Sequence, residues 1–239
     1  MQACPQGSTV TIQNIDANHR HTANGRPAQY RYGSVFLLTL ALVVFVIAAP
    51  TADWSRAVAI AIEGVALVFA IATAREREQV RRHRAVGVSV LMIILIALVA
   101  TGALPDELTD AANVLITAAI PVVIVGGLLR LLRERGVTVQ AVAGALAIYL
   151  TVGLVFAWII GFITHVDSTL YFAQHTDGTE GDRVYFSFTV LTTTGFGDFS
   201  AATPVGHALT VIEELTGQLY LVTVIGLLIG NFVGRRKTT

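Results

Sequence analysis

The segment TTTGFGDF, residues 192–199, places hydroxyls, two glycines and one carboxylate between two apolar stretches. Glycine tolerates positive φ, so Gly195 and Gly197 let the backbone around Phe196 alternate in conformation and turn carbonyls inward. Together with the Thr193 hydroxyl, such carbonyls form oxygen cages that suit hard cations. The sequence contains no nucleophile–base pair and no metal-ligand spacing. These residues therefore predict cation binding and not an enzyme.

The composition is typical of a membrane protein. Of 239 residues, 54% are hydrophobic and 13% are charged, with a mean hydropathy of +0.68, whereas water-soluble domains carry about 25% charged residues. The net charge of zero gives no reason to expect nucleic acid as a partner. Cys4 is the single cysteine, which excludes an intrachain disulfide. Residues 1–32 are polar and predict a disordered cytoplasmic tail.

Six apolar stretches are long enough to cross a bilayer, whose core of ~30 Å requires about 20 helical residues. They cover residues 33–49, 54–74, 85–104, 111–129, 139–162 and 204–233. Between the fifth and the sixth, the apolar piece VYFSFTVLTT begins at Val184 and is too short to cross. We expect it to enter the membrane and return, which non-helical backbone does only where it lines water or lies inside protein.

The re-entrant piece predicts a helix over residues 183–192 whose C-terminal end points at the bilayer centre. The partial negative charge of that helix end favours a cation there, and TTGFG then returns the chain to the surface. One loop supplies one wall of an ion site, so four identical subunits are expected to close the ring. The predicted fold is an all-α membrane protein with six transmembrane helices, a re-entrant pore helix and a filter loop, assembled as a homotetramer.

The basic residues predict the orientation of the helices. With six spans, 14 of the 16 Lys and Arg residues fall on one side, in the tail, residues 75–84, residues 130–135 and the C-terminus. Because cytoplasmic loops carry the excess of basic residues, both termini are predicted to be cytoplasmic in a multi-pass protein of the cell membrane. The opposite side is acidic, which either concentrates cations at an opening or reflects ordinary solvated loops.

Residues 185–234 resemble the pore module of the potassium channel superfamily, in particular the two-helix pore domain of bacterial ion channels. The family filter pattern T-x-G-[YF]-G-D is matched by residues 193–198. YFSFTVLTT resembles the pore helix, and GHALTVIEELTGQLYLVTVIGLLIG resembles the inner, pore-lining helix. Gly217 falls where the family places its gating-hinge glycine. With the fifth stretch as outer helix, the resemblance extends over residues 136–239.

The resemblance implies roles for the filter residues. Dehydrated K+ would be held by backbone carbonyls, plus the Thr193 hydroxyl, at Thr193, Thr194, Gly195 and Phe196. Gly197 and Asp198 would form the outer mouth. K+ is the transported ion, and no cofactor is expected.

Two filter positions differ from the commonest family residues. Thr194 stands where valine or isoleucine is typical, and Phe196 stands where tyrosine is commonest. Phe196 therefore lacks a hydroxyl that can tether the filter to the pore helix, which leaves open a weakly selective cation channel. Thr189 stands where some bacterial channels carry a glutamate behind the filter. No role is predicted for Phe199.

Acidic residues inside predicted spans are costly at the bilayer centre, by ~3 kcal/mol or more, and normally have partners. Glu213 is predicted to brace the filter by accepting hydrogen bonds from Ser187 or Thr189, with a gating or proton-sensing role as the alternative. Glu63 is the acid of the second span, and the sequence names no partner for it. The role of Glu214 also stays open.

The first four spans lack the signs of a voltage sensor, which requires several arginines at three-residue spacing within the membrane. Arg130 and Arg133 lie at the predicted cytoplasmic edge, and Pro121 is expected to interrupt the fourth helix. The basic segment Arg75–Arg84 predicts an interior anchor or an anionic-lipid site. Three histidines, at positions 165, 175 and 207, either sense pH or are solvated.

The sequence thus predicts three parts: a tail over 1–32, a four-helix transmembrane domain over 33–135, and a pore domain over 136–239. The predicted function is a potassium-selective channel subunit. A weakly selective cation channel remains one alternative, and a subunit of a potassium transporter is another. A receptor-like use of the first four helices also stays open.

Overall fold

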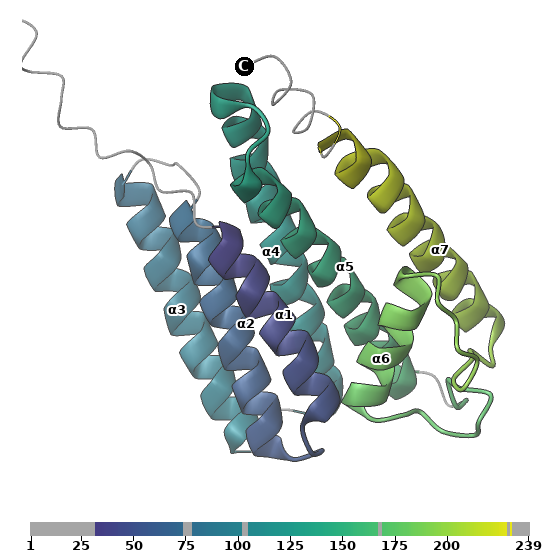
Figure 1. The fold of residues 1–239 in the computed structure, drawn as a ribbon. Coiled ribbons are helices and arrows are strands. Elements are labelled where there is room, and N and C mark those ends of the chain that lie inside the picture. Colours follow the sequence, from purple (N-terminus) through teal and green to yellow (C-terminus); the bar gives the residue numbers. More distant parts are fainter. Residues whose placement is uncertain (1–31, 74–77, 102–104, 167–168, 229, 231–239) are drawn as a thin grey trace, which may run out of the picture.

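The computed structural model describes residues 32–73, 78–101, 105–166, 169–228 and 230 of the chain. The predicted all-α class is confirmed, and among these residues the only β-structure is a pair of isolated bridges (Figure 1). The helices are α1 (Tyr32–Ala48), α2 (Asp53–Thr73), α3 (Glu78–Ala100), α4 (Asp106–Arg135), α5 (Val139–Val166), α6 (Glu180–Leu191) and α7 (Pro204–Tyr220). The last helix continues into a π-helical turn, η2 (Leu221–Ile225).

Four segments are long and apolar enough to cross a membrane: Trp54–Ala72, Leu108–Arg133, Val139–Val166 and Pro204–Leu228. They belong to α2, α4, α5 and to α7 with its extension. The apolar helices Tyr32–Ala48 and Val86–Val99 are shorter. The chain is therefore a helical membrane protein with at least four helices of spanning length, and the count of six spans stays a prediction.

The first four helices pack against one another and against α5. α4 lies along α5, α1 contacts both α2 and α5, and α3 packs on α2 (Figure 1). Residues 136–138 alone connect α4 to α5, so the two helices lie side by side within one chain. Gly136 closes α4 with a φ of 67° and donates its N–H to the Leu132 carbonyl at 2.9 Å.

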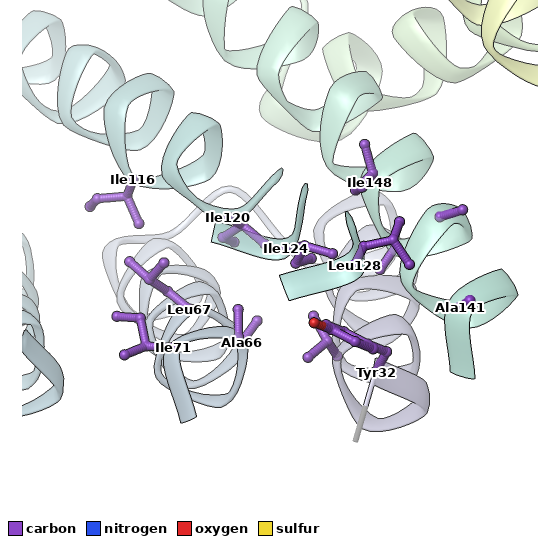
Figure 2. Close-up of a cluster of buried hydrophobic side chains, with 14 of the residues drawn as sticks. Tyr32, Ala66, Leu67, Ile71, Ile116, Ile120, Ile124, Leu128, Ala141 and Ile148 are labelled. Carbon is purple, nitrogen blue, oxygen red and sulfur yellow. The ribbon is translucent and has the colours of Figure 1, made fainter. Parts of the chain in front are cut away.

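An apolar core joins these helices. Figure 2 shows Ile120 and Ile124 of α4 packed with Leu67 of α2, Ile148 of α5 and Tyr32 of α1. All five side chains are buried. Burial of an aliphatic side chain of this size contributes about 1.5–3 kcal/mol when the alternative is water.

The fourth helix differs from its prediction. The sequence placed it at residues 111–129 and expected Pro121 to interrupt it, but α4 runs unbroken from Asp106 to Arg135 with Pro121 inside. Proline removes the hydrogen bond to the carbonyl four residues earlier, here Thr117. The helix continues because its backbone has no water to bond at this depth and the neighbouring helices hold it. Residues 106–110 and 130–135 are helical as well, although they are too polar to be included in a span that is chosen by hydropathy.

Glu63 of α2 is fully buried and joins three helices. Its Oε1 accepts hydrogen bonds from the Thr117 hydroxyl of α4 at 3.0 Å and from the Trp158 indole N–H of α5 at 3.1 Å. The partners that the sequence left unnamed are therefore Thr117 and Trp158. Because Trp158 belongs to α5, this acid connects the first four helices to the segment that precedes α6.

We expect Glu63→Ala to lower the free energy of unfolding by about 3 kcal/mol, because it unpairs two buried donors and leaves a cavity. Glu63→Gln keeps the accepting carbonyl oxygen and is expected to melt close to the wild type. Thermal unfolding of the detergent-solubilised protein measures both, with the exposed Val65→Ala of the same helix as a control. An equal loss of stability in the Gln and Ala variants would show that the acceptor oxygen at position 63 does not stabilise the fold.

Candidate functional site

The helix α6 begins at a capping box. The Asp182 N–H donates to the Thr179 hydroxyl at 3.1 Å, and the Thr179 N–H donates to Asp182 Oδ2 at 2.8 Å. This reciprocal pair satisfies two backbone donors that a helix start leaves open. The predicted helix over 183–192 is thereby extended to Glu180–Leu191.

The loop after α6 has the alternating backbone that the glycine pattern predicted. Thr193, Gly195 and Gly197 have φ values of 57°, 53° and 81°. Every second residue of this stretch therefore lies in the left-handed region, which only glycine adopts without strain. Thr193 takes this conformation although it has a β-branched side chain, so its surroundings must hold it there.

The end of α6 supplies that hold. The Thr193 N–H donates to the Val190 carbonyl at 2.8 Å, and the N–H groups of Thr194 and Gly195 both donate to the Thr189 carbonyl, at 2.8 and 3.1 Å. Three consecutive loop amides are thus directed at α6, and because N–H and C=O point in opposite directions across a trans peptide, the carbonyls of residues 192–194 face away from these acceptors. The loop and the last turn of α6 form one hydrogen-bonded unit.

Behind this unit, α5 and α7 converge on α6. The buried Ser187 hydroxyl lies 2.6 Å from the Gly153 carbonyl of α5 and is also hydrogen-bonded to Oε1 of Glu213 on α7. One hydroxyl proton cannot serve two acceptors, so both contacts are hydrogen bonds only when a neutral Glu213 donates to the Ser187 oxygen and Ser187 donates to the Gly153 carbonyl. Of the two partners predicted for Glu213, Ser187 is in contact with it, whereas the Thr189 hydroxyl donates to the Phe186 carbonyl at 2.8 Å.

Gly217 lies where α7 crosses the end of α6. A β-carbon at this position would overlap the Leu191 carbonyl oxygen, which also accepts a hydrogen bond from the Tyr149 hydroxyl at 3.0 Å. The α-helix is continuous through Gly217, and its departure from α-geometry begins four residues later, at Leu221. The structure thus gives Gly217 a close-approach role, and its role as a hinge stays a prediction.

Two aromatic residues support the loop and were missed by the sequence analysis. The Tyr185 ring of α6 stacks on Phe196 with centroids 6.2 Å apart and an interplanar angle of 3°. A side-chain hydrogen bond with Asp198 raises the pKa of Tyr185. Phe199 packs edge-on against Phe172 at 5.0 Å and against Tyr185 at 6.4 Å. The sequence signal that could have identified Tyr185 is the aromatic pair in YFSF, which resembles the pore helix of the family.

The loop residues are exposed in the single chain. Phe196 is 69% exposed, and a cavity of about 460 Å³ opens between the loop, α6 and α7. Thr193, Gly195 and Gly197 line it together with His207 and Glu214 of α7. Among the described residues there is no group of His, Cys, Asp or Glu that could hold a metal ion. The loop residues that line the cavity carry backbone oxygens and, at Thr193, a hydroxyl oxygen.

The three predicted histidines lie at different places. His165 Nδ1 is 3.2 Å from Asp110 Oδ2, and His207 Nε2 is 2.8 Å from the Ala201 carbonyl, so both have partners within the chain. His175 has a φ of 57° in the loop before α6. The predicted anionic-lipid segment Arg75–Arg84 lies outside the described residues in its first part, and the side chains of its later arginines are also outside them.

Residues 144–233 match a protein family whose description is an ion channel. No curated protein and no solved structure shows a match to this chain. The matched segment contains most of α5, all of α6, the loop with alternating φ, and α7. The match supports an ion channel function for this part of the molecule, and α1 to α4 lie outside it.

We expect Gly217→Ala to cost about 1–3 kcal/mol of stability, because the added methyl group displaces α7 from the end of α6. Thermal unfolding in detergent measures the loss. Gly226→Ala is the matched control on the same helix, since a β-carbon there would have Leu221 O at 3.8 Å as its nearest neighbour. An unchanged melting temperature in Gly217→Ala would refute the close-approach role and favour the hinge.

Proposed function

We propose that four copies of this chain form a potassium-selective channel in the cell membrane. Backbone carbonyls of residues 193–196 hold dehydrated K+ on the four-fold axis, and Asp198 lies at the outer mouth. The observation that carries the proposal is the positive φ of Thr193, Gly195 and Gly197, which alternates with the intervening residues. Such alternation orients successive carbonyls to one side, as a column of cation sites requires.

The hydrogen bonds of the loop support this assignment. Because the amides of residues 193–195 donate to α6 carbonyls, the free carbonyls are the groups available to an ion. K+ then replaces its hydration shell with fixed oxygens, and repulsion between ions in neighbouring sites moves them onward. The family match over residues 144–233 agrees with ion conduction.

The exposed face of α7 supports the tetramer. Only 22% of the span Pro204–Leu228 is buried within one chain, against 56% of the α5 span. The exposed apolar side chains of α7 and η2 include Val205, Val211, Ile212, Leu215, Leu219 and, on η2, Val222. The filter loop beside them is exposed too, and one loop forms a single wall of an ion site. Neighbouring copies around an axis cover both features, and closed symmetry is the usual solution for identical subunits.

The proposed orientation follows the basic residues of the sequence. α1 starts and α7 ends at one end of the bundle, and the turn between α1 and α2 lies at the other (Figure 1). With the excess of basic residues inside the cell, the start of α6 and the Asp198 mouth face outward. Both chain termini then lie in the cytoplasm.

A weakly selective cation channel is the second candidate. Phe196 has no hydroxyl, and its contact with α6 is the stacked Tyr185 ring. Stacking fixes the ring plane but gives a looser tether than a hydrogen bond, so the filter could admit Na+. The reversal potential of the reconstituted channel under opposed K+ and Na+ gradients separates the two candidates. A value that ignores the K+ gradient would refute potassium selectivity.

We expect Gly195→Ala to reduce the K+ over Na+ permeability ratio by about tenfold or more, because a left-handed alanine costs ~1–2 kcal/mol. A β-carbon at Gly195 meets nothing within 4 Å in the single chain, so backbone strain is the cause. Reversal potentials in planar bilayers measure the ratio. Gly126→Ala in α4, also without neighbours within 4 Å, is the control. Wild-type selectivity in Gly195→Ala would overturn the filter assignment.

Tyr185→Phe is expected to shorten the time for which the channel stays conducting under sustained K+ current. The variant keeps the ring that stacks on Phe196 and loses the hydrogen bond to Asp198. Tyr185→Leu loses both contacts and is expected to decay faster still. Decay times of macroscopic current give this ranking, and equal decay in all three proteins would show that Tyr185 does not support the filter.

A further inference from the structure

The first turn of α6 is docked on helices that lie outside the family match. The side chains of Arg56 on α2 and Glu180 on α6 form an ion pair with 2.6 Å between Nε and Oε1. Beside it, Gly181 lies against the end of α1, where a β-carbon would be 3.1 Å from the Val46 carbonyl oxygen and 3.2 Å from that of Ile47. Two helices of the four-helix domain thus hold the start of α6.

Further charged groups surround this contact. Arg183 is buried and donates from Nη1 to the Thr164 hydroxyl of α5 at 3.2 Å. A β-carbon at Gly161 would lie 2.8 Å from Asp110 Oδ2 and 3.4 Å from Arg183 Cζ, so the α4 carboxylate and the α6 guanidinium meet at one point on α5. The charges at this site come from α2, α4 and α6, and α5 contributes the Thr164 hydroxyl.

The other end of α6 holds the filter loop. A helix of 12 residues, Glu180–Leu191, is a rigid rod of about 18 Å at 1.5 Å per residue. Its last turn presents the Thr189 and Val190 carbonyls that bind the amides of residues 193–195. A shift or tilt of the first turn is therefore carried along the rod to the groups that set the loop backbone.

We propose that Arg56 and Glu180 are positioning residues for the filter, through which the four-helix domain sets the conducting geometry from the outer end of α6. This inference rests on the proposed function of the loop as a potassium filter. Neither residue touches the permeating ion. Their ion pair fixes where α6 begins, and α6 fixes where the filter carbonyls point.

The energetics of the pair suit orientation better than stability. The two side chains are 31% and 16% exposed, so both lose hydration, and the loss offsets much of the attraction. Burial raises the pKa of Glu180 despite Arg56 and Arg183. Removing one partner nevertheless leaves the other charge uncompensated, which disturbs the local geometry. Exchanging the charges of Arg56 and Glu180 therefore separates the effect of the ion pair from the effect of an uncompensated charge.

External acid is expected to act on the same contact. Because the pKa of Glu180 is raised, lowering the external pH protonates it sooner than a solvated glutamate and removes the ion pair. The other charged and titratable groups that interact with it are Arg56 and Glu63 of α2, Asp110 of α4 with its partner His165 of α5, and Arg183 of α6. From α1, the described neighbours of Gly181 are apolar.

The test uses the full chain reconstituted in bilayers, with Arg56→Glu, Glu180→Arg and the double swap R56E/E180R. We expect each single variant to reduce open probability or the K+ over Na+ permeability ratio about three- to tenfold, and the double swap to restore most of it. Thr101→Glu, which adds a carboxylate just after α3 at the same end of the bundle, is the control and should conduct like the wild type. Glu180→Gln should conduct at neutral pH as the wild type does in acid, without a further response to acid.

A second readout does not depend on current. Hydrogen exchange of the amides of residues 180–199 in nanodiscs should rise in Arg56→Glu and return in the double swap. Wild-type conduction and exchange in both single variants would overturn the positioning role, as would single variants impaired without rescue by the swap. A wild-type protein that passes no K+-selective current would refute the proposed function instead, and the exchange data would then still decide whether Arg56 and Glu180 position the loop.

Discussion

The loop of residues 193–197 exists because its amides have partners at the end of α6. Backbone at membrane depth has little water to bond, so each N–H must find an acceptor inside the protein. Three consecutive amides find it in the carbonyls of Thr189 and Val190, which a helix end leaves without intrahelical donors. The same bonds that complete α6 therefore direct the carbonyls of residues 192–194 away from it, in a stretch where Thr193, Gly195 and Gly197 have positive φ.

Small residues let the supporting helices reach α6. Gly153 of α5 faces Phe188, where a β-carbon would lie 2.9 Å from the ring, and Gly217 of α7 faces the Leu191 carbonyl. The buried Ser187 of α6 contacts both neighbouring helices, through the Gly153 carbonyl of α5 and the Glu213 carboxyl group of α7. α6 is thus clamped from both sides along its length, and the loop inherits that rigidity. Replacement of either glycine would act on the loop without touching it.

The sequence predicted local features well and tertiary partners poorly. Apolar length located the helices, and the spacing of Gly195 and Gly197 predicted their positive φ, because both depend on residues close in the chain. The prediction at Pro121 was wrong because α4 continues through the proline while packed against neighbouring helices, and local sequence rules do not include such packing. The partners of Glu63, the stacking of Tyr185 on Phe196 and the packing of Phe199 join distant segments or depend on how the loop folds back. A single sequence contains no local pattern that predicts which distant residues pair in this way.

Helices α1 to α4 are attached at three levels to the part of the chain that contains the ion channel family match, which argues for a scaffold and against a mobile sensor. Residues 136–138 join α4 directly to α5 at one end, Glu63 bonds Trp158 in the middle, and Arg56 pairs with Glu180 at the other end. A voltage sensor must slide charge through the field, and sliding would break buried hydrogen bonds at the middle level. The span of α4 carries its first arginine only at Arg130, so the field has little to pull on. The structure therefore favours a mechanism in which α1 to α4 affect α5 and α6 through small changes at these contacts, and not through large helix motion.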